Sequence, residues 1–76
     1  MTQDDKTQFI NSLAEQWPRT FVLRSEVGNF SAGLITPGTI RNLDSQGKGP
    51  RDRFRIGKRV CYPTSALVEF LKTMTK

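Results

Sequence analysis

The first apolar pattern in the chain has helical spacing and is followed by a proline at position 18. Its four apolar members are Phe9, Ile10, Leu13 and Trp17. Apolar residues spaced three to four apart share one face of a helix, and proline cannot continue a helix. The pattern predicts a helix over residues 4–17 with this face buried in the core. A dimer contact through Trp17 is the alternative.

The next apolar residues predict a short extended segment, residues 21–23, and then a second helix over residues 25–32. Ser25 is a candidate N-cap, because its side-chain oxygen can accept a hydrogen bond from a free backbone N–H. Val27 and Phe30 lie three residues apart and form its apolar face. Gly33 can end the helix in a left-handed conformation.

A third helix is predicted over residues 37–46, only a few residues after the second. Thr36 is its candidate N-cap, and Pro37 suits the first helical position, where its missing N–H is not needed. Its apolar residues are Ile40 and Leu43, and Gly47 is expected to end it. Two short helices joined by a tight, glycine-containing turn have the outline of a helix-turn-helix.

The alternating residues 53–62 predict a β-hairpin. A two-residue loop would split the apolar residues between both faces. A three-residue loop, residues 57–59, places the apolar residues on one face by pairing Phe54 with Tyr62 and Ile56 with Val60. We prefer the three-residue loop, because burial of one face normally sets the register of a strand pair. In that register the outer face carries Arg53, Arg55 and Cys61.

The last pattern predicts a helix over residues 64–74, capped by Thr64 or Ser65. Its apolar stripe consists of Leu67, Phe70, Leu71 and Met74. The chain of 76 residues is therefore expected to form one α+β (mainly α) domain over residues 1–76.

Charge is unevenly distributed along the chain. Residues 1–35 have a net charge of −1, whereas residues 36–76 carry nine basic and three acidic residues and have a net charge of +6. Positive charge gathered on one half of a small domain favours a polyanionic partner, nucleic acid before membrane. A solubilising charge excess is the alternative.

Composition argues against several classes of protein. With one cysteine and no histidine, the chain cannot form an internal disulfide, a common zinc site or a histidine-dependent triad. We therefore expect no enzyme activity, no cofactor and no metal, with Cys61 a semi-buried strand residue. No apolar run approaches the ~20 residues of a membrane span, and the acidic start does not resemble a signal peptide. A cytoplasmic location without membrane contact is expected.

The predicted third helix carries polar residues off its apolar face. The candidates for DNA contact are Thr36, Gly38, Thr39, Arg41, Asn42 and Ser45. Arginine can bond guanine bidentately, asparagine can do the same with adenine, and a threonine methyl can touch thymine. The alternative is a solvated helix surface. Gly38 either allows close backbone approach to a phosphate or is a tolerated first-turn glycine.

The loop and the hairpin supply a second set of candidates. These are Lys48, Arg51, Arg53, Arg55, Lys58 and Arg59. Cations on a projecting hairpin suit phosphates or an adjacent minor groove. Protection of an exposed edge strand is the alternative. Because the hairpin carries four basic residues and no acid, DNA contact is favoured.

The order of these motifs resembles a known family. Thr36-x-x-Thr39, Gly49-Pro50, Arg55-Ile56-Gly57 and the closing Leu67…Phe70-Leu71 resemble the small winged helix-turn-helix domains of the excisionase and MerR-like group, which includes phage excisionases and prophage Alp-type regulators. The resemblance covers about residues 21–72. The turn before Thr36 is longer than in that family, and the helix over residues 4–17 lies outside the shared part.

The resemblance implies a DNA-binding protein whose third helix enters the major groove and whose hairpin forms a wing on the backbone or minor groove. It implies a phage or prophage excisionase, a recombination directionality factor that binds and bends attachment-site DNA. The expected partners are double-stranded DNA, an integrase or recombinase, and further copies of the chain on DNA. A small prophage-type transcriptional regulator is the first alternative. A protein-interaction adaptor using the N-terminal helix is the second.

Overall fold

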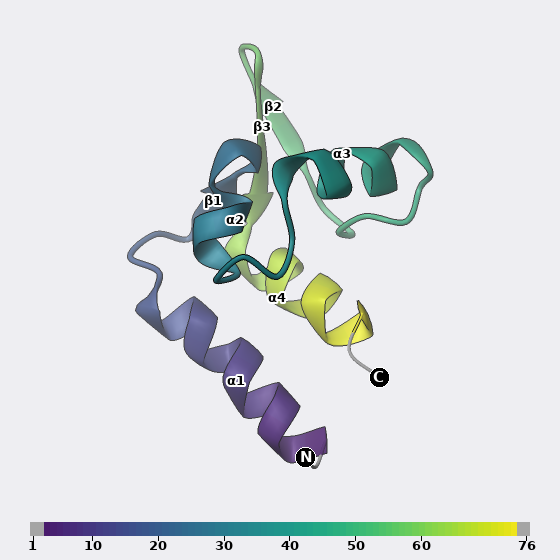
Figure 1. Cartoon of the computed structure of the whole chain (residues 1–76). Coiled ribbons are helices and arrows are strands. Elements are labelled where there is room, and N and C mark those ends of the chain that lie inside the picture. Colours follow the sequence, from purple (N-terminus) through teal and green to yellow (C-terminus); the bar gives the residue numbers. More distant parts are fainter. Residues whose placement is uncertain (1–2, 75–76) are drawn as a thin grey trace.

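The chain folds into helices packed around one small sheet (Figure 1). The computed structural model describes residues 3–74, so residues 1–2 and 75–76 of the predicted domain lie outside the described part. The elements are α1 (Gln3–Gln16), β1 (Phe21–Leu23), the 3₁₀ turn η1 (Arg24–Glu26), α2 (Val27–Phe30), α3 (Pro37–Ser45), β2 (Phe54–Ile56), β3 (Arg59–Pro63) and α4 (Thr64–Met74). The α+β class is confirmed.

Helix α1 packs against α4 at the end of the molecule opposite the β2–β3 hairpin (Figure 1). The predicted stripe is buried in part: Ile10 and Leu13 belong to the core. Trp17 lies edge-on to Phe30, with ring centroids 5.4 Å apart, and packs against that core. Phe9 stays 47% exposed, so the stripe serves mainly as core.

The second helix differs from the prediction for residues 25–32. It begins directly after β1 as η1 and continues as the one-turn α2. Ser25 is exposed within η1 and does not cap the helix, which is a correction. The carboxylate of Glu26 caps the start of η1 instead, because it accepts a hydrogen bond from the Leu23 N–H at 3.2 Å. Val27 and Phe30 are buried as predicted.

A buried serine organises the connection between α2 and α3. The Ser31 hydroxyl donates to the Val27 carbonyl at 2.7 Å and accepts from the Ile35 N–H at 3.1 Å. Ala32 and Gly33 both adopt positive φ, 57° and 85°, and the Gly33 N–H closes the turn on the Gly28 carbonyl. The connection between α2 and α3 is longer than a tight turn, and hydrogen bonds to the Ser31 side chain satisfy some of its backbone groups.

Helix α3 has the caps that the sequence predicts. The Thr36 side chain accepts from the Thr39 N–H at 3.2 Å, and Pro37 occupies the first helical position. Gly47, with φ of 73°, follows the helix in the left-handed conformation. Ile40 is fully buried, whereas Leu43 is partly buried against the core.

The sheet is antiparallel with the strand order β1-β3-β2. The preferred hairpin register is wrong, because Phe54 pairs with Cys61 and Ile56 with Arg59, which leaves the two-residue loop Gly57-Lys58. Gly57 has φ of 62°, as the first loop position of a type II′ turn requires, and such a turn matches the twist of the strands.

This register splits the apolar residues of the hairpin between two faces. Tyr62 pairs with Val22 on β1, and both are fully buried against the helices. Val60 and its partner Arg55 share that face. Phe54 and Ile56 lie on the other face, 43% and 64% exposed. Burial did not set the register, because the outer half of the hairpin projects beyond the body (Figure 1).

Helix α4 follows β3 without a linker and matches the predicted bounds. Its start is joined to the connection between α1 and β1, since the Thr64 hydroxyl donates to the Arg19 carbonyl at 3.1 Å. Leu67, Phe70 and Leu71 are buried, whereas Met74 is 48% exposed. Cys61, predicted as semi-buried, is buried, with 3% of its surface exposed. None of the helices within residues 3–74 is long and apolar enough to cross a membrane.

Candidate nucleic-acid interface

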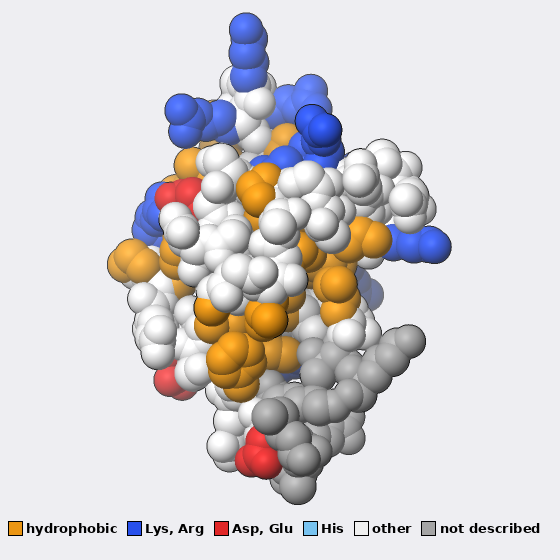
Figure 2. All heavy atoms as spheres, viewed as in Figure 1, with side chains coloured by type: hydrophobic (Ala, Val, Ile, Leu, Met, Phe, Trp, Pro, Cys, Tyr) orange, Lys and Arg blue, Asp and Glu red, His pale blue; other side chains and the backbone are white. Residues whose placement is uncertain are grey.

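The structure exposes every residue that the sequence singled out for DNA contact. The six from the third helix lie on α3 and its N-cap, and the six basic residues lie on the connection from α3 to β2, on the hairpin and at its tip. Figure 2 shows Lys and Arg side chains gathered at the end of the molecule formed by the hairpin and α3. Helix α1 lies at the opposite end (Figure 1).

The exposed face of α3 follows from its burial pattern. Ile40 points into the core, so Arg41 and Asn42, the next two residues, face solvent. Ser45 is exposed as well, although its hydroxyl donates to the Asn42 carbonyl at 2.7 Å. A Cβ at Gly38 would meet nothing within 4 Å, so packing inside the protein does not explain this glycine.

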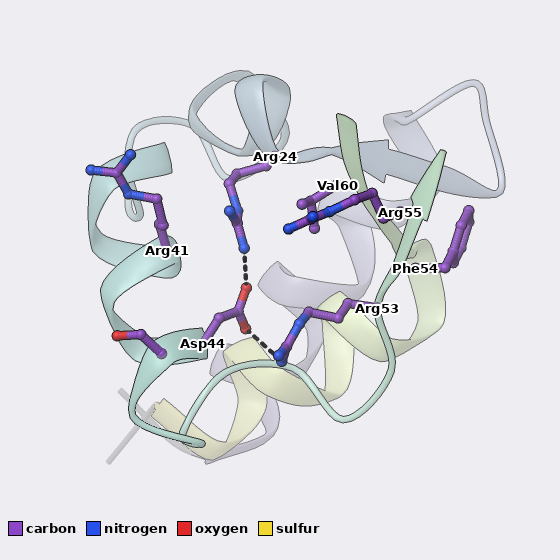
Figure 3. A pocket seen from close by; sticks show the side chains of 8 residues that line it. Arg24, Arg41, Asp44, Arg53, Phe54, Arg55 and Val60 are labelled. Atoms are coloured by element: carbon purple, nitrogen blue, oxygen red, sulfur yellow. Dashed lines mark hydrogen bonds and ion pairs between the residues drawn. The ribbon is translucent and has the colours of Figure 1, made fainter. Parts of the chain in front are cut away.

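An open groove of about 390 Å³ separates α3 from the hairpin (Figure 3). Its lining residues are Arg24, Arg41, Asp44, Ser45, Arg53, Phe54, Arg55 and Val60. Arg55 points into the groove from β2, whereas Phe54 leaves the strand on the opposite side (Figure 3). The four arginines and one aspartate make the groove strongly positive, which suits a phosphate chain.

A second hollow of similar volume, about 390 Å³, lies between η1, the start of α3 and the hairpin. Its lining includes Lys58 and Arg59 near the hairpin tip and Pro37 at the first position of α3. The start of a helix carries unpaired N–H groups and a partial positive charge. Positive groups therefore border both hollows.

Asp44 lines the groove between α3 and the hairpin and contacts several other side chains there. Its Oδ2 accepts from Nη2 of Arg24 at 2.7 Å and from the Tyr62 hydroxyl at 2.5 Å. Its Oδ1 lies 3.6 Å from Nη1 of Arg53, yet has no hydrogen-bond partner among the described residues. The Asp44 side chain is only 4% exposed, so this carboxylate links α3 to η1 and β3 inside the fold.

Burial and hydrogen bonds change the ionisation of this cluster. Burial, assisted by the bond to Asp44, raises the pKa of Tyr62 to about 12, so its hydroxyl stays protonated and can donate. Burial disfavours the Arg24 cation, but bonds to Tyr62 and Asp44 outweigh it and raise the Arg24 pKa. The Oδ2 atom of Asp44 therefore faces a permanent cation, Arg24, and a hydroxyl that can donate.

Sequence reasoning missed the parts played by Asp44, Arg24 and Tyr62. Asp44 follows Ile40 by four residues, and this spacing places it on the buried face of the helix. That signal was available, but its partners lie 18 and 20 residues away in the chain, and helical spacing cannot identify them.

Gly49 leaves room for this carboxylate. A Cβ at Gly49 would collide with Oδ1 of Asp44 and stand 2.9 Å from its Cγ. The backbone after α3 is thus folded closely over Asp44, with the Lys48 N–H donating to the Leu43 carbonyl at 2.8 Å. Any side chain at position 49 must displace the carboxylate or the connection.

The candidate interface therefore consists of the exposed face of α3, the basic connection, the hairpin and the groove between them. Asp44 and its hydrogen-bond partners link α3, on one wall of the groove, to η1 and β3. Comparisons of the chain with protein-family models, with curated proteins and with solved structures found no match.

Proposed function

We propose that this protein is a small winged helix-turn-helix DNA-binding protein, with α2 and α3 as the helix-turn-helix and the β2–β3 hairpin as the wing. Helix α3 enters the major groove, where Arg41 and Asn42 reach base edges. The wing lies along the backbone or the adjacent minor groove. The start of α3 approaches a phosphate at Gly38, where the absent side chain lets the backbone come close.

One observation carries the proposal: exposed residues of α3, Arg41 and Ser45, border the same positive groove as two exposed arginines from the hairpin side, Arg53 and Arg55. Residues 53–62 contain four basic residues and no acid. Of the two acids in residues 36–60, Asp44 is buried against Arg24, and only Asp52 is exposed. An edge strand protected from aggregation needs far fewer charges.

Within this class we propose an excisionase, which binds and bends attachment-site DNA so that an integrase excises the DNA segment. Copies of the protein on adjacent sites would add their bends. A small transcriptional regulator is the second candidate, since it needs the same binding surface. Bending by pairs of protomers favours the excisionase, whereas altered promoter output without an integrase favours the regulator.

The adaptor alternative has less support from the packing. Of the four apolar residues in the N-terminal stripe, Ile10 and Leu13 lie in the core of this chain and Trp17 packs against it. Phe9 alone remains exposed. A single exposed aromatic residue on a surface helix is common and does not define an interface.

The test of the proposed function is a fluorescence-anisotropy titration of a random-sequence duplex at several salt concentrations. Four to five neutralised phosphates give a slope of about −4 for log affinity against log salt. Such a slope supports the DNA interface, and site selection from a random library then identifies the preferred sequence. Absence of binding at low salt would overturn the proposal and direct attention to Phe9 and a protein partner.

A further inference from the structure

The outer face of the hairpin carries two exposed apolar side chains among cations. Phe54 and Ile56 occupy the same face of β2, because they are two residues apart in a strand. Their exposure rises toward the tip, from 43% to 64%. On β3 the same face carries Arg59, the cross-strand partner of Ile56, and the buried Cys61, the partner of Phe54.

We infer that Ile56 is an apolar wedge that enters the minor groove and partly unstacks one base step, so that the wing bends the DNA it binds. This inference rests on the proposed function and adds a specific bending residue to it. Minor-groove proteins commonly insert an isoleucine, leucine or phenylalanine between bases, which kinks the duplex by about 20–90°.

The position of Ile56 on the hairpin suits it to act as a wedge. It directly precedes the two-residue turn Gly57-Lys58, so it stands at the narrow end of the hairpin (Figure 1). Its strand neighbour Arg55 points the other way, into the groove beside α3 (Figure 3). The wing can therefore hold phosphates with one face while presenting an apolar edge with the other.

Charge identifies DNA as the occupant of this apolar face. Lys58 lies in the turn that follows Ile56, Arg59 pairs with Ile56 across the hairpin, and both cations are exposed. A second copy of this equally basic hairpin would bring like charges together, whereas a minor groove is a site of concentrated negative potential that attracts arginine. Arg59 lies on the same face as Ile56 and can enter the groove beside it.

The test compares Ile56→Thr with the wild type on a short duplex that carries dyes at both ends and a flexible pyrimidine–purine step at its centre. Threonine keeps the β-branched shape that suits a strand but replaces the ethyl branch of isoleucine with a hydroxyl. A fluorescent base analogue at the central step reports unstacking, and energy transfer between the dyes reports bending. Ile56→Met, which stays apolar, is the rescue variant.

Leu34→Thr is the matched control, because Leu34 is as exposed as Ile56, at 64%, but lies in the α2–α3 connection. We expect wild type, Ile56→Met and Leu34→Thr to bend and unstack the duplex. Ile56→Thr should lose at least half of both signals while its affinity changes less than about threefold, since cations supply most of that affinity. Ile56→Gln, checked for folding by circular dichroism, provides a second polar variant.

The outcomes separate this inference from the proposed function. If Ile56→Thr and Ile56→Gln bend and unstack the duplex as well as the wild type does, Ile56 is not a wedge, although the protein still binds DNA. If the wild type binds without unstacking the central step, the wedge is likewise overturned. If the wild type does not bind the duplex at all, both the wedge and the proposed function fail.

Discussion

The hydroxyl of Tyr62 donates to Oδ2 of Asp44 at 2.5 Å and thereby ties strand β3 to helix α3. Arg24 donates to the same oxygen at 2.7 Å and also to the Tyr62 hydroxyl at 3.0 Å. These three side chains come from three separate elements, and each is hydrogen-bonded to the other two. The position of the proposed recognition helix relative to the wing therefore depends on a buried polar contact as well as on the apolar core.

Replacing the carboxylate at the centre should destabilise the fold. Asp44→Ala leaves Arg24 and the Tyr62 hydroxyl without their shared partner, and breaking a buried pair from one side costs about 3 kcal/mol. Urea unfolding followed by circular dichroism measures the loss. Asp52→Ala is the matched control, because Asp52 is exposed and should change stability by less than about 0.5 kcal/mol. An equal loss of unfolding free energy in both variants would contradict the stabilising role of the Asp44 carboxylate.

Tyr62 should make stability fall in the alkaline range. Its folded pKa, about 12, lies above the ordinary tyrosine pKa of 10.0, so the fold favours the protonated hydroxyl. This contribution is fully present below pH 10 and is lost as the pH rises to about 12, by about 2–3 kcal/mol in all. Unfolding free energies measured across this range should fall less steeply for Tyr62→Phe. Parallel curves for wild type and variant would show that another group causes the loss.

Two glycine substitutions near α3 should have opposite effects on stability. Gly49→Ala puts a Cβ into the Asp44 carboxylate and should cost about 1–3 kcal/mol, as overpacking does. Gly38→Ala meets no neighbour and should stabilise the protein by about 0.4–1 kcal/mol. Thermal unfolding gives both values.

The Gly38 variant also tests the proposed phosphate contact. A Cβ at this position would hold the backbone away from the DNA, so Gly38→Ala should weaken duplex binding although the protein is more stable. Unchanged affinity in an anisotropy titration would leave Gly38 as a tolerated first-turn glycine.

Sequence discrimination should depend on the exposed face of α3. Arg41→Ala and Asn42→Ala should each reduce the preference for a selected site over random DNA by about 1–3 kcal/mol, the value of one bidentate base contact. Competition titrations with both duplexes measure this preference. If either variant loses the same affinity for both duplexes, that residue does not read bases.

The wing should act through charge. Arg59→Ala or Arg55→Ala should weaken binding to all sequences and reduce the slope of log affinity against log salt by about one unit. Lys72→Ala is the control, since Lys72 lies in the last turn of α4 and lines neither of the two grooves. A slope that is unchanged in Arg59→Ala would mean that this residue does not contact phosphate.

Most element boundaries could be predicted from the sequence because their signals are local. Thr36 and Pro37 start α3, and Gly47 ends it, through hydrogen bonds and dihedral angles within a few residues. The exposure of Arg41 and Asn42 follows from their places beside Ile40. Such features depend on neighbours in the chain, so the spacing of apolar residues and the positions of capping residues are enough to predict them.

The second helix shows where local signals compete. Ser25 has the chemistry of an N-cap, but Glu26 accepts the hydrogen bond from Leu23 N–H and lies 2.5 Å from Nη2 of Arg19. The Arg19 pairing is the main cause that lowers the Glu26 pKa and keeps it charged. Because β1 is anchored on β3, the chain leaves the strand directly into η1, and Ser25 falls inside the turn.

The sequence by itself determined the first, third and last helices, the existence of the hairpin and the concentration of positive charge in the second half of the chain. Only the tertiary structure decided the register of Phe54 and Ile56 and the partners of Asp44. The hairpin leaves the body, so its turn geometry at Gly57 outweighs burial and exposes both apolar residues. Asp44 meets Tyr62 and Arg24 across 18 and 20 residues, and contacts at that distance exist only after the elements have packed.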